Sequence, residues 1–161
     1  IKILRVHGSE PKYYHSYIGI NGRLDAIQAA VLSVKLEYLN DWSESRRWVA
    51  SYYSERLTGL PIRLPKIESY NTHIFHQYVI ATSQREELAQ YLKHHGIETA
   101  IYYPVSLHLQ KCFEYLGYKE GDLPESEKAS RETLALPIFP EITLKEQDYV
   151  IGHIKNFFTG R

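Results

Sequence analysis

The chain has 161 residues, of which 43% are hydrophobic and 24% charged, proportions typical of a globular domain that buries a core without disulfides or metal. Its 19 basic and 19 acidic residues balance, which argues against nucleic acid as a partner, because phosphate binding needs a basic surplus or patch. No apolar run reaches the roughly 20 residues that span a bilayer, so we expect no membrane association. The single cysteine, Cys112, excludes an internal disulfide and fits a reducing compartment, which favours a cytoplasmic location.

Two features of the composition are unusual. The sequence contains no methionine, even at its first position, so we expect it to begin inside a larger protein. It also contains 14 tyrosines. A tyrosine combines a large apolar ring with a hydroxyl group, which suits an interface or a polar aromatic pocket. Ordinary packing of the rings is the alternative.

The first 58 residues divide into a turn-rich segment and a long helix. Residues 1–22 show little periodicity and are expected to form a loop that packs against something else. Residues 23–58 are predicted to form a helix, because apolar side chains recur at three- and four-residue steps at Leu24, Ile27, Val31, Val34 and Tyr38. This apolar face is wide, as in a helix buried against a domain body. The helix exceeds the usual length, so we expect a kink or a role at the junction of two domains and a dimer partner.

A polar turn with Asn21 and Arg23 precedes the predicted helix. The amide and the guanidinium are hydrogen-bond donors that suit phosphate or carboxylate, and a helix N-terminus favours anions. The turn is therefore a candidate anion site. An ordinary capped helix start with a surface arginine is the alternative.

Residues 59–161 are predicted to form short strands with helices between them, which is an α+β arrangement. The segments 73–81 and 98–103 are rich in strand formers, and 134–140 is apolar and extended. Two capping boxes, Ser83 with Glu86 and Thr143 with Glu146, predict helix starts. Further helices are expected at about 109–116 and from Asp122 to about Leu134.

Few residues between 59 and 161 are candidates for a catalytic or metal-binding role. His73 and His76 lie three apart on a predicted strand and would point to opposite faces, so we expect no metal site. Cys112 lies in a predicted helix and is expected to be buried. Tyr102 and Tyr103 end a predicted strand, so at least one of them faces a cleft, a partner or solvent. From these residues alone, the chain is an α+β domain with a turn suited to anions.

Several motifs, in the order in which they occur, resemble the C-terminal half of the DegT/DnrJ/EryC1/StrS family of sugar aminotransferases. The motifs span nearly the whole chain and are Arg5-x-His7-Gly8, Gly19-x-Asn21-x-Arg23-Leu24-Asp25-x-x-Gln28-Ala29-Ala30, His76-Gln77-Tyr78, Gly96-Ile97-x-Thr99, Tyr103-Pro104 with Leu107-His108, Leu116-Gly117-Tyr118 and Leu134-x-Leu136-Pro137.

The resemblance implies the type I fold of pyridoxal 5'-phosphate (PLP) enzymes and a homodimer that moves an amino group, usually from glutamate, to a keto group of a nucleotide-linked sugar. It divides the chain into a loop at the large-domain and dimer interface (1–22), a long interdomain helix (23–58) and a small C-terminal domain (59–161), with a short, mostly antiparallel sheet and helices packed on it. It also implies that Asn21 reaches the cofactor phosphate of the partner subunit.

For the substrate, the resemblance implies that Arg23 contacts the sugar nucleotide across the same interface. Tyr102 and Tyr103 match positions that approach the substrate, although Tyr102 is often histidine in the family, and His108 matches a position near the same pocket.

The family's N-terminal domain, which carries the Schiff-base lysine, the aspartate paired with the pyridine nitrogen and the aromatic stacked on the ring, has no counterpart in this sequence. We therefore expect no catalytic residue in this chain, and the chain alone to be inactive. Two alternatives stay open. One is a sugar dehydratase of the same family, in which the lysine is replaced. The other is a non-catalytic module for dimerisation or for binding a sugar nucleotide.

Overall fold

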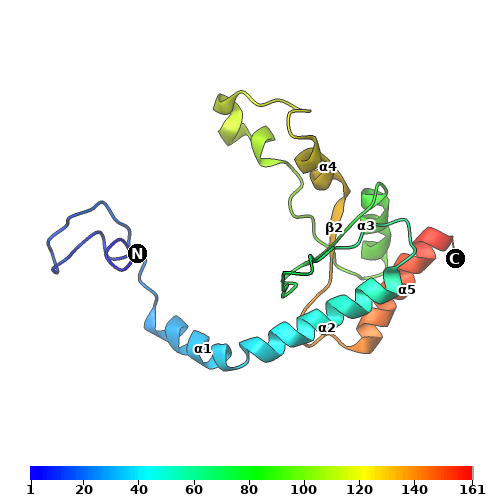
Figure 1. Cartoon of the computed structure of the whole chain (residues 1–161), viewed down its shortest axis with the longest axis horizontal. Coiled ribbons are helices and arrows are strands. Elements are labelled where there is room, and N and C mark those ends of the chain that lie inside the picture. The colour runs from blue at the N-terminus through cyan, green and yellow to red at the C-terminus, as the bar shows by residue number, and fades with distance from the viewer. Residues whose placement is uncertain (161) are drawn as a thin grey trace. The chain divides into compact units, whose positions relative to one another are not determined.

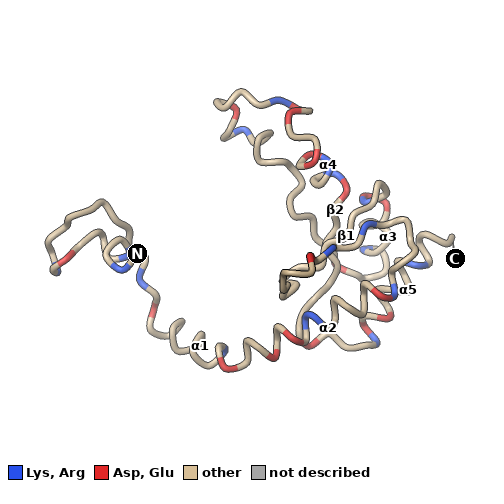
Figure 2. The backbone as a smooth tube through the Cα atoms, viewed as in Figure 1, with Lys and Arg blue, Asp and Glu red and all other residues tan. Residues whose placement is uncertain are grey.

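The computed structural model describes residues 1–160, which form two compact units, Ile1–Asn40 and a larger unit from Asp41 onward (Figure 1). The first unit holds an irregular loop and helix α1 (Ala26–Glu37). Helix α2 (Leu39–Leu57) crosses from the first unit into the second. Figure 2 shows basic and acidic residues interspersed along both units.

The predicted helix 23–58 is two helices in the structure, separated at Tyr38 (φ −97°, ψ −1°). Asp25 caps the first of them: its Oδ1 accepts from the backbone N–H of Ile27 at 2.9 Å and of Gln28 at 3.4 Å. The helix therefore begins at Ala26, and Arg23 precedes it outside any helix or strand. The expected burial of the apolar face is found in α2, where Val49, Tyr53 and Leu57 are buried, but not in α1, which has no buried residue and in which Ile27 is 75% exposed.

The larger unit is built on a two-stranded antiparallel sheet, β1 (Tyr78–Ala81) and β2 (Thr133–Leu136), in which Tyr78 pairs with Leu136 and Ala81 with Thr133. The predicted strands are shorter than expected. Phe75 has a left-handed φ of 48°, which is incompatible with continuous extended backbone, so β1 starts only at Tyr78. The predicted strand 98–103 contributes a single bridge, between Ala100 and Ala135.

Three α-helices and two short 3-10 helices complete this unit: α3 (Arg85–His94), η1 (Leu107–Leu109), η2 (Lys111–Leu116), α4 (Pro124–Glu132) and α5 (Leu144–Thr159). The segment near 109–116 is thus 3-10 rather than α-helical. Cys112 in it is exposed, so its predicted burial is wrong. Among the described residues, no helix is long and apolar enough to cross a membrane.

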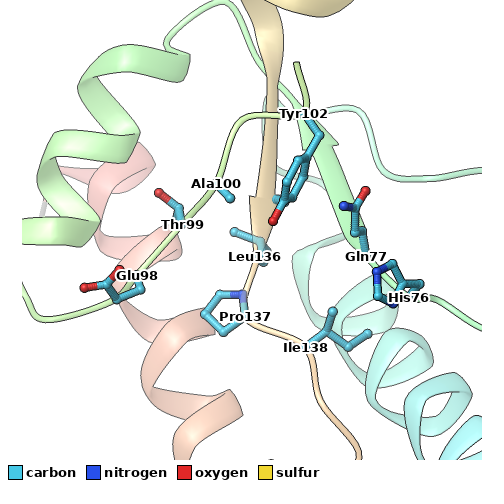
Figure 3. A pocket seen from close by; sticks show the side chains of 10 residues that line it. His76, Gln77, Glu98, Thr99, Ala100, Tyr102, Leu136, Pro137 and Ile138 are labelled. Carbon is cyan, nitrogen blue, oxygen red and sulfur yellow. The ribbon is translucent and has the colours of Figure 1, made fainter. Parts of the chain in front are cut away.

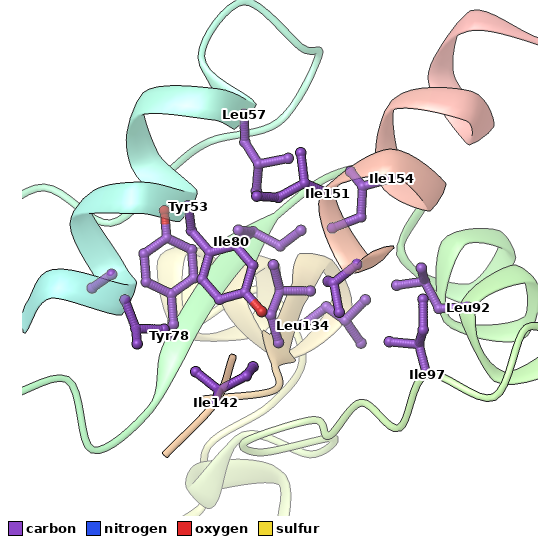
Figure 4. Packing of buried hydrophobic residues seen from close by; sticks show 14 of the residues in the cluster. Tyr53, Leu57, Tyr78, Ile80, Leu92, Ile97, Leu134, Ile142, Ile151 and Ile154 are labelled. Atoms are coloured by element: carbon purple, nitrogen blue, oxygen red, sulfur yellow. The ribbon is translucent and has the colours of Figure 1, made fainter. Parts of the chain in front are cut away.

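The core lies between the sheet, α2, α3 and α5 (Figure 4). Tyr53 of α2 and Tyr78 of β1 are fully buried with Ile80, Leu134 and Ile154. Each such aliphatic side chain contributes about 1.5–3 kcal/mol when it leaves water. The buried hydroxyls keep partners: Tyr53 donates to the Pro137 carbonyl at 3.0 Å, and Tyr78 lies 2.8 Å from Ser54 Oγ. Burial raises the pKa of both phenols, which stay neutral. The structure confirms the predicted α+β class with a short antiparallel sheet and helices packed on it.

Candidate functional site

The turn with Asn21 and Arg23 is held in place by backbone bonds to the start of the chain. Asn21 forms a bridge with Val6, the Gly22 N–H donates to the Arg5 carbonyl at 2.9 Å, and the His7 N–H donates to the Ile20 carbonyl at 3.1 Å. The turn therefore has a defined backbone, although it contains no regular secondary structure.

Two glycines permit this close approach. A Cβ at Gly8 would collide with the carbonyl oxygen of Tyr17, and a Cβ at Gly19 would collide with the backbone nitrogen of Gly8. Gly8 also has a left-handed φ of 72°, which glycine adopts without strain. The loop 1–22, which the sequence leaves irregular, thus folds back on itself where side chains are absent.

The two predicted donors of the turn contact each other. Arg23 Nε donates to Asn21 Oδ1 at 3.2 Å, and both residues are exposed. This bond uses the acceptor of the Asn21 side chain. The Nδ2 group of Asn21 and the terminal amino groups of Arg23 are donors, so the pair presents hydrogen-bond donors and a positive charge.

Arg23 also lines a cavity of about 400 Å³ together with residues of the loop, namely Val6, His7, Ser9, Lys12, Tyr13 and His15. Lys12 and Arg23 are its charged lining residues, and both are cations. Arginine binds carboxylate and phosphate through two parallel hydrogen bonds, and lysine acts as a point charge. The composition of this cavity suits an anionic group.

The larger unit carries a second candidate site around Tyr102. This residue lines a cavity of about 280 Å³ with His76, Gln77, Thr99 and residues of β2. Figure 3 shows the Tyr102 ring reaching toward Leu136, with Thr99 and Ala100 on one side and Gln77 and His76 on the other. The hydroxyl and amide groups among these side chains can orient a polar ligand.

Tyr102 also borders a neighbouring cavity of about 450 Å³, which Tyr103, Ser106, Gln110 and Ser130 line with it. Tyr102 and Tyr103 are 43% and 73% exposed. Both tyrosines are thus open to a ligand or a partner, and neither is a core residue.

His108, the third residue predicted in this region, is buried. Its Nε2 lies 3.0 Å from Oε1 of Glu127, and both side chains are 4% exposed. The ring is not among the residues that line either cavity around Tyr102. The structure therefore separates His108 from the two tyrosines with which it was grouped.

The hydroxyl that shares a cavity with His7 and His15, Ser9 Oγ, donates to the Val6 carbonyl at 3.0 Å and to neither ring. Within residues 1–160, no group of three metal-binding side chains is close enough to hold an ion. The Nδ1 atom of His73 instead accepts a hydrogen bond from the backbone N–H of Phe75 at 3.0 Å. What the described residues can do is bind and orient: an anion at the turn of residues 21–23, and a polar group at Tyr102 and Tyr103.

Comparison with known proteins decides the family. The sequence pattern of the DegT/DnrJ/EryC1/StrS aminotransferase family matches residues 1–155. The chain belongs to this family.

Individual members of the family support the assignment. The chain is 49% identical over 160 residues to the pleiotropic regulatory protein of Geobacillus stearothermophilus, covering 98% of the chain and 43% of that protein. It is 36% identical over 157 residues to dTDP-3-amino-3,6-dideoxy-alpha-D-galactopyranose transaminase of Aneurinibacillus thermoaerophilus, with coverages of 98% and 43%. The crystal structure of Streptomyces venezuelae DesV superposes with a TM-score of 0.93 at 36% identity, over 97% of this chain and 42% of that one.

These matches have two consequences. The predicted resemblance and the type I PLP aminotransferase fold are confirmed. The chain also spans less than half of the length of the DegT/DnrJ/EryC1/StrS relatives that it matches.

Sequence reasoning missed Glu127 and Ser106. Glu127 is the one buried residue of α4, and Ser106 is 5% exposed. No motif identifies either residue, because a glutamate on a helix and a serine in a loop are usually solvated. Their burial follows only from the way in which the segment after Tyr103 folds against α4.

Proposed function

We propose that this chain is the C-terminal part of a PLP-dependent aminotransferase, which moves an amino group from glutamate to a keto group of a nucleotide-linked sugar. The enzyme acts as a homodimer in the cytoplasm. The observation that carries the proposal is the donor pair of Asn21 and Arg23 beside a cavity whose charged lining residues are both cations. Membership of the aminotransferase family and a transaminase relative that acts on a dTDP sugar support it.

The donors of the turn fit the anionic groups of such a reaction. The Asn21 amide would hold the cofactor phosphate of the partner subunit, and Arg23 would pair with the phosphates of the sugar nucleotide. Tyr102 and Tyr103 would orient the sugar through their hydroxyls. PLP supplies the electron sink. The Schiff-base lysine that holds it would lie in a part of the enzyme equivalent to the portion of the relatives that this chain does not cover. The proposed domain roles, an interface loop at 1–22, an interdomain helix at 23–58 and a small domain at 59–161, belong to the same assignment.

The cofactor contact is tested with Asn21→Asp in the full-length enzyme, because this change keeps the shape of the side chain and adds a charge that repels phosphate. The loss of a hydrogen bond to a charged group predicts PLP affinity weaker by about 10-fold to 100-fold, measured from cofactor absorbance after dialysis. Asn71→Asp, at an exposed asparagine outside both sites, is the matched control. Unchanged PLP affinity in Asn21→Asp would make the turn an ordinary helix start.

The dimer is tested by mixing two variants, Asn21→Asp, assayed at a PLP concentration too low to fill its own site, and a variant that lacks the Schiff-base lysine. If Asn21 acts on the partner's cofactor, hybrid dimers hold one complete site, and random pairing restores about a quarter of the parent activity. No recovery in the mixture would contradict action across the interface.

The reaction itself is tested by supplying glutamate and a panel of keto sugar nucleotides to the full-length enzyme. An amino sugar is the expected product, and Arg23→Lys should raise the KM for the sugar nucleotide while PLP stays bound. Loss of water from the sugar without amination would identify a dehydratase. Binding without turnover would identify a non-catalytic module.

A further inference from the structure

The segment that carries Tyr102 and Tyr103 has little apolar packing. Among residues 102–109, the only buried residues are Ser106 and His108, which are 5% and 7% exposed over the whole residue. The large apolar residues of the segment face outward, with Leu107 72% and Tyr103 73% exposed. Because hydrophobic burial scales with the apolar area removed from water, contacts within residues 1–160 contribute little of it to the position of this segment. Polar contacts must therefore supply much of the restraint.

Both buried side chains of the segment reach α4. His108 Nε2 lies 3.0 Å from Glu127 Oε1, and Ser106 Oγ donates to Ser130 Oγ at 3.4 Å. Ser130 Oγ in turn donates to the Glu127 carbonyl at 2.8 Å. Of the two contacts with α4, the one to Glu127 is shorter and involves an ionisable group.

Glu127 also organises the turn that precedes α4. Its carboxylate accepts from the Gly121 N–H at 2.8 and 3.0 Å and from the Leu123 N–H at 3.4 Å, while Arg131 Nη1 lies 3.9 Å away. Burial opposes ionisation of this group, but the hydrogen bonds from Gly121, His108 and Leu123 outweigh it and hold the pKa of Glu127 below its ordinary value of 4.5.

The charge of Glu127 fixes the direction of the bond to His108. An ionised carboxylate only accepts, so His108 Nε2 must donate. Nδ1 is buried and has no hydrogen-bond partner within residues 1–160. His108 is thus committed to Glu127 through one nitrogen. Loss of Glu127 would leave the buried ring without a hydrogen-bond partner, whereas loss of His108 would leave the carboxylate with its bonds from Gly121 and Leu123.

We propose that the buried pair of His108 and Glu127 is a positioning device, which fixes the segment 102–109 on α4 and so holds Tyr102 and Tyr103 at the site for the nucleotide-linked sugar. The inference rests on the proposed function for the identity of the substrate. Neither member of the pair touches the substrate in this scheme; both act through the two tyrosines.

The test uses His108→Phe and Glu127→Leu in the full-length enzyme, because neither new side chain can form the hydrogen bond of the pair. Misplacement of the tyrosines should raise the KM for the sugar nucleotide about tenfold or more. The half-reaction with glutamate alone, followed by cofactor absorbance, should change less than about twofold, because the small amino donor does not need these tyrosines. His108→Gln, whose amide can replace the Nε2 donor, should restore the KM to near the parent value.

Two controls separate positioning from general damage. Glu125→Gln removes an exposed carboxylate from the same helix and should leave the KM unchanged. In a background with both Tyr102→Phe and Tyr103→Phe, His108→Phe should raise the KM by less than about twofold more, because residues that act through one another are not additive.

Hydrogen exchange supplies a readout that is independent of activity. In His108→Phe, amides of residues 102–109 should exchange faster, while those of α2 and α5 keep their rates. Unchanged exchange in 102–109 would overturn the inference, as would an equal slowing of both half-reactions. If the parent enzyme aminates no nucleotide sugar, the proposed function fails, and the exchange rates still decide whether the pair holds the segment.

Discussion

At the scale of single residues, Arg46 shows how one side chain organises distant parts of the larger unit. Its Nη1 donates to the carbonyls of Ile138 at 3.1 Å, His76 at 3.2 Å and Phe75 at 3.3 Å. These carbonyls belong to the segment before β1 and the segment after β2. No sequence motif predicts this role, because Arg46 lies on what reads as the polar side of a helix.

Arg46→Met should lower the free energy of unfolding by about 1.5–3 kcal/mol, since hydrogen bonds from a charged donor are lost and carbonyls are left unpaired. Its neighbour Arg47 is the control, because it forms a long salt bridge, at 3.9 Å, to the exposed Glu44. Arg47→Met should cost less than about 0.5 kcal/mol. Urea unfolding measures both, and equal effects would contradict the role of Arg46.

At the scale of elements, the two predicted capping boxes had different outcomes. In α5, Thr143 Oγ1 accepts from the Glu146 N–H at 3.2 Å, and Glu146 Oε2 accepts from the Thr143 N–H at 2.8 Å, so this box is confirmed. In α3, the cap residue is Gln84 without a side-chain cap, so the predicted box of Ser83 and Glu86 is wrong. The pattern is the same in both segments, but α3 begins one residue later than its box requires.

Two similar substitutions should therefore change the free energy of unfolding by different amounts. Thr143→Ala should destabilise the protein by about 1 kcal/mol, because a helix cap is lost. Ser83→Ala, at an exposed serine that caps nothing, should change the free energy of unfolding by less than about 0.5 kcal/mol. The comparison is made by denaturant unfolding, and a larger effect at Ser83 would show that its box forms in solution.

His95, which follows α3, and His153 of α5 form a pair whose contribution to stability should depend on pH. The rings of His95 and His153 lie 4.2 Å apart, and Tyr149 and Tyr91 flank His153 at 4.4 and 6.0 Å. Burial, and then the nearby His95, lower the pKa of His153 below its ordinary value of 6.5. The unfolded chain therefore binds the proton more readily, so this contribution to stability is complete above about pH 6.5 and is lost as the pH falls.

We expect the melting temperature to drop between about pH 7.5 and pH 5.5, and the drop to shrink in His153→Phe, which cannot be protonated. His94→Phe removes an exposed histidine next to the pair and should keep the full drop. Calorimetry at the two pH values compares the three proteins. An identical drop in His153→Phe would assign the acid response to other groups.

At the scale of the whole molecule, the core belongs to one unit. All hydrophobic residues of the buried cluster lie between Val49 and Ile154, whereas residues 1–40 contribute none. A chain that starts at Leu39 should consequently unfold cooperatively, with a melting temperature within a few degrees of that of the whole chain. Thermal unfolding followed by circular dichroism measures this, and a loss of cooperativity would show that residues 1–38 are needed for the fold.

The sequence predicted the features that depend on local pattern: the α+β class, the capped start of α5 and the donors Asn21 and Arg23. It did not predict those that depend on tertiary contacts. The family resemblance placed His108 near the pocket of Tyr102, which stays a prediction, but it did not predict the bond of the ring to Glu127, 19 residues away. The length of β1 was set by the backbone of Phe75, which periodicity does not reveal.

The exposed apolar face of α1 has a thermodynamic consequence for the turn before it. A helix of 12 residues that buries none of its side chains is marginally stable in water. Asp25 joins the turn of residues 21–23 to the first helical residues, so the proposed binding of an anion at the turn would also favour the helix. Linkage is reciprocal. A surface that covers α1 would tighten anion binding at the turn by the same factor by which the anion strengthens the binding of that surface. Affinity at this site is therefore a measure of assembly as well as of local chemistry.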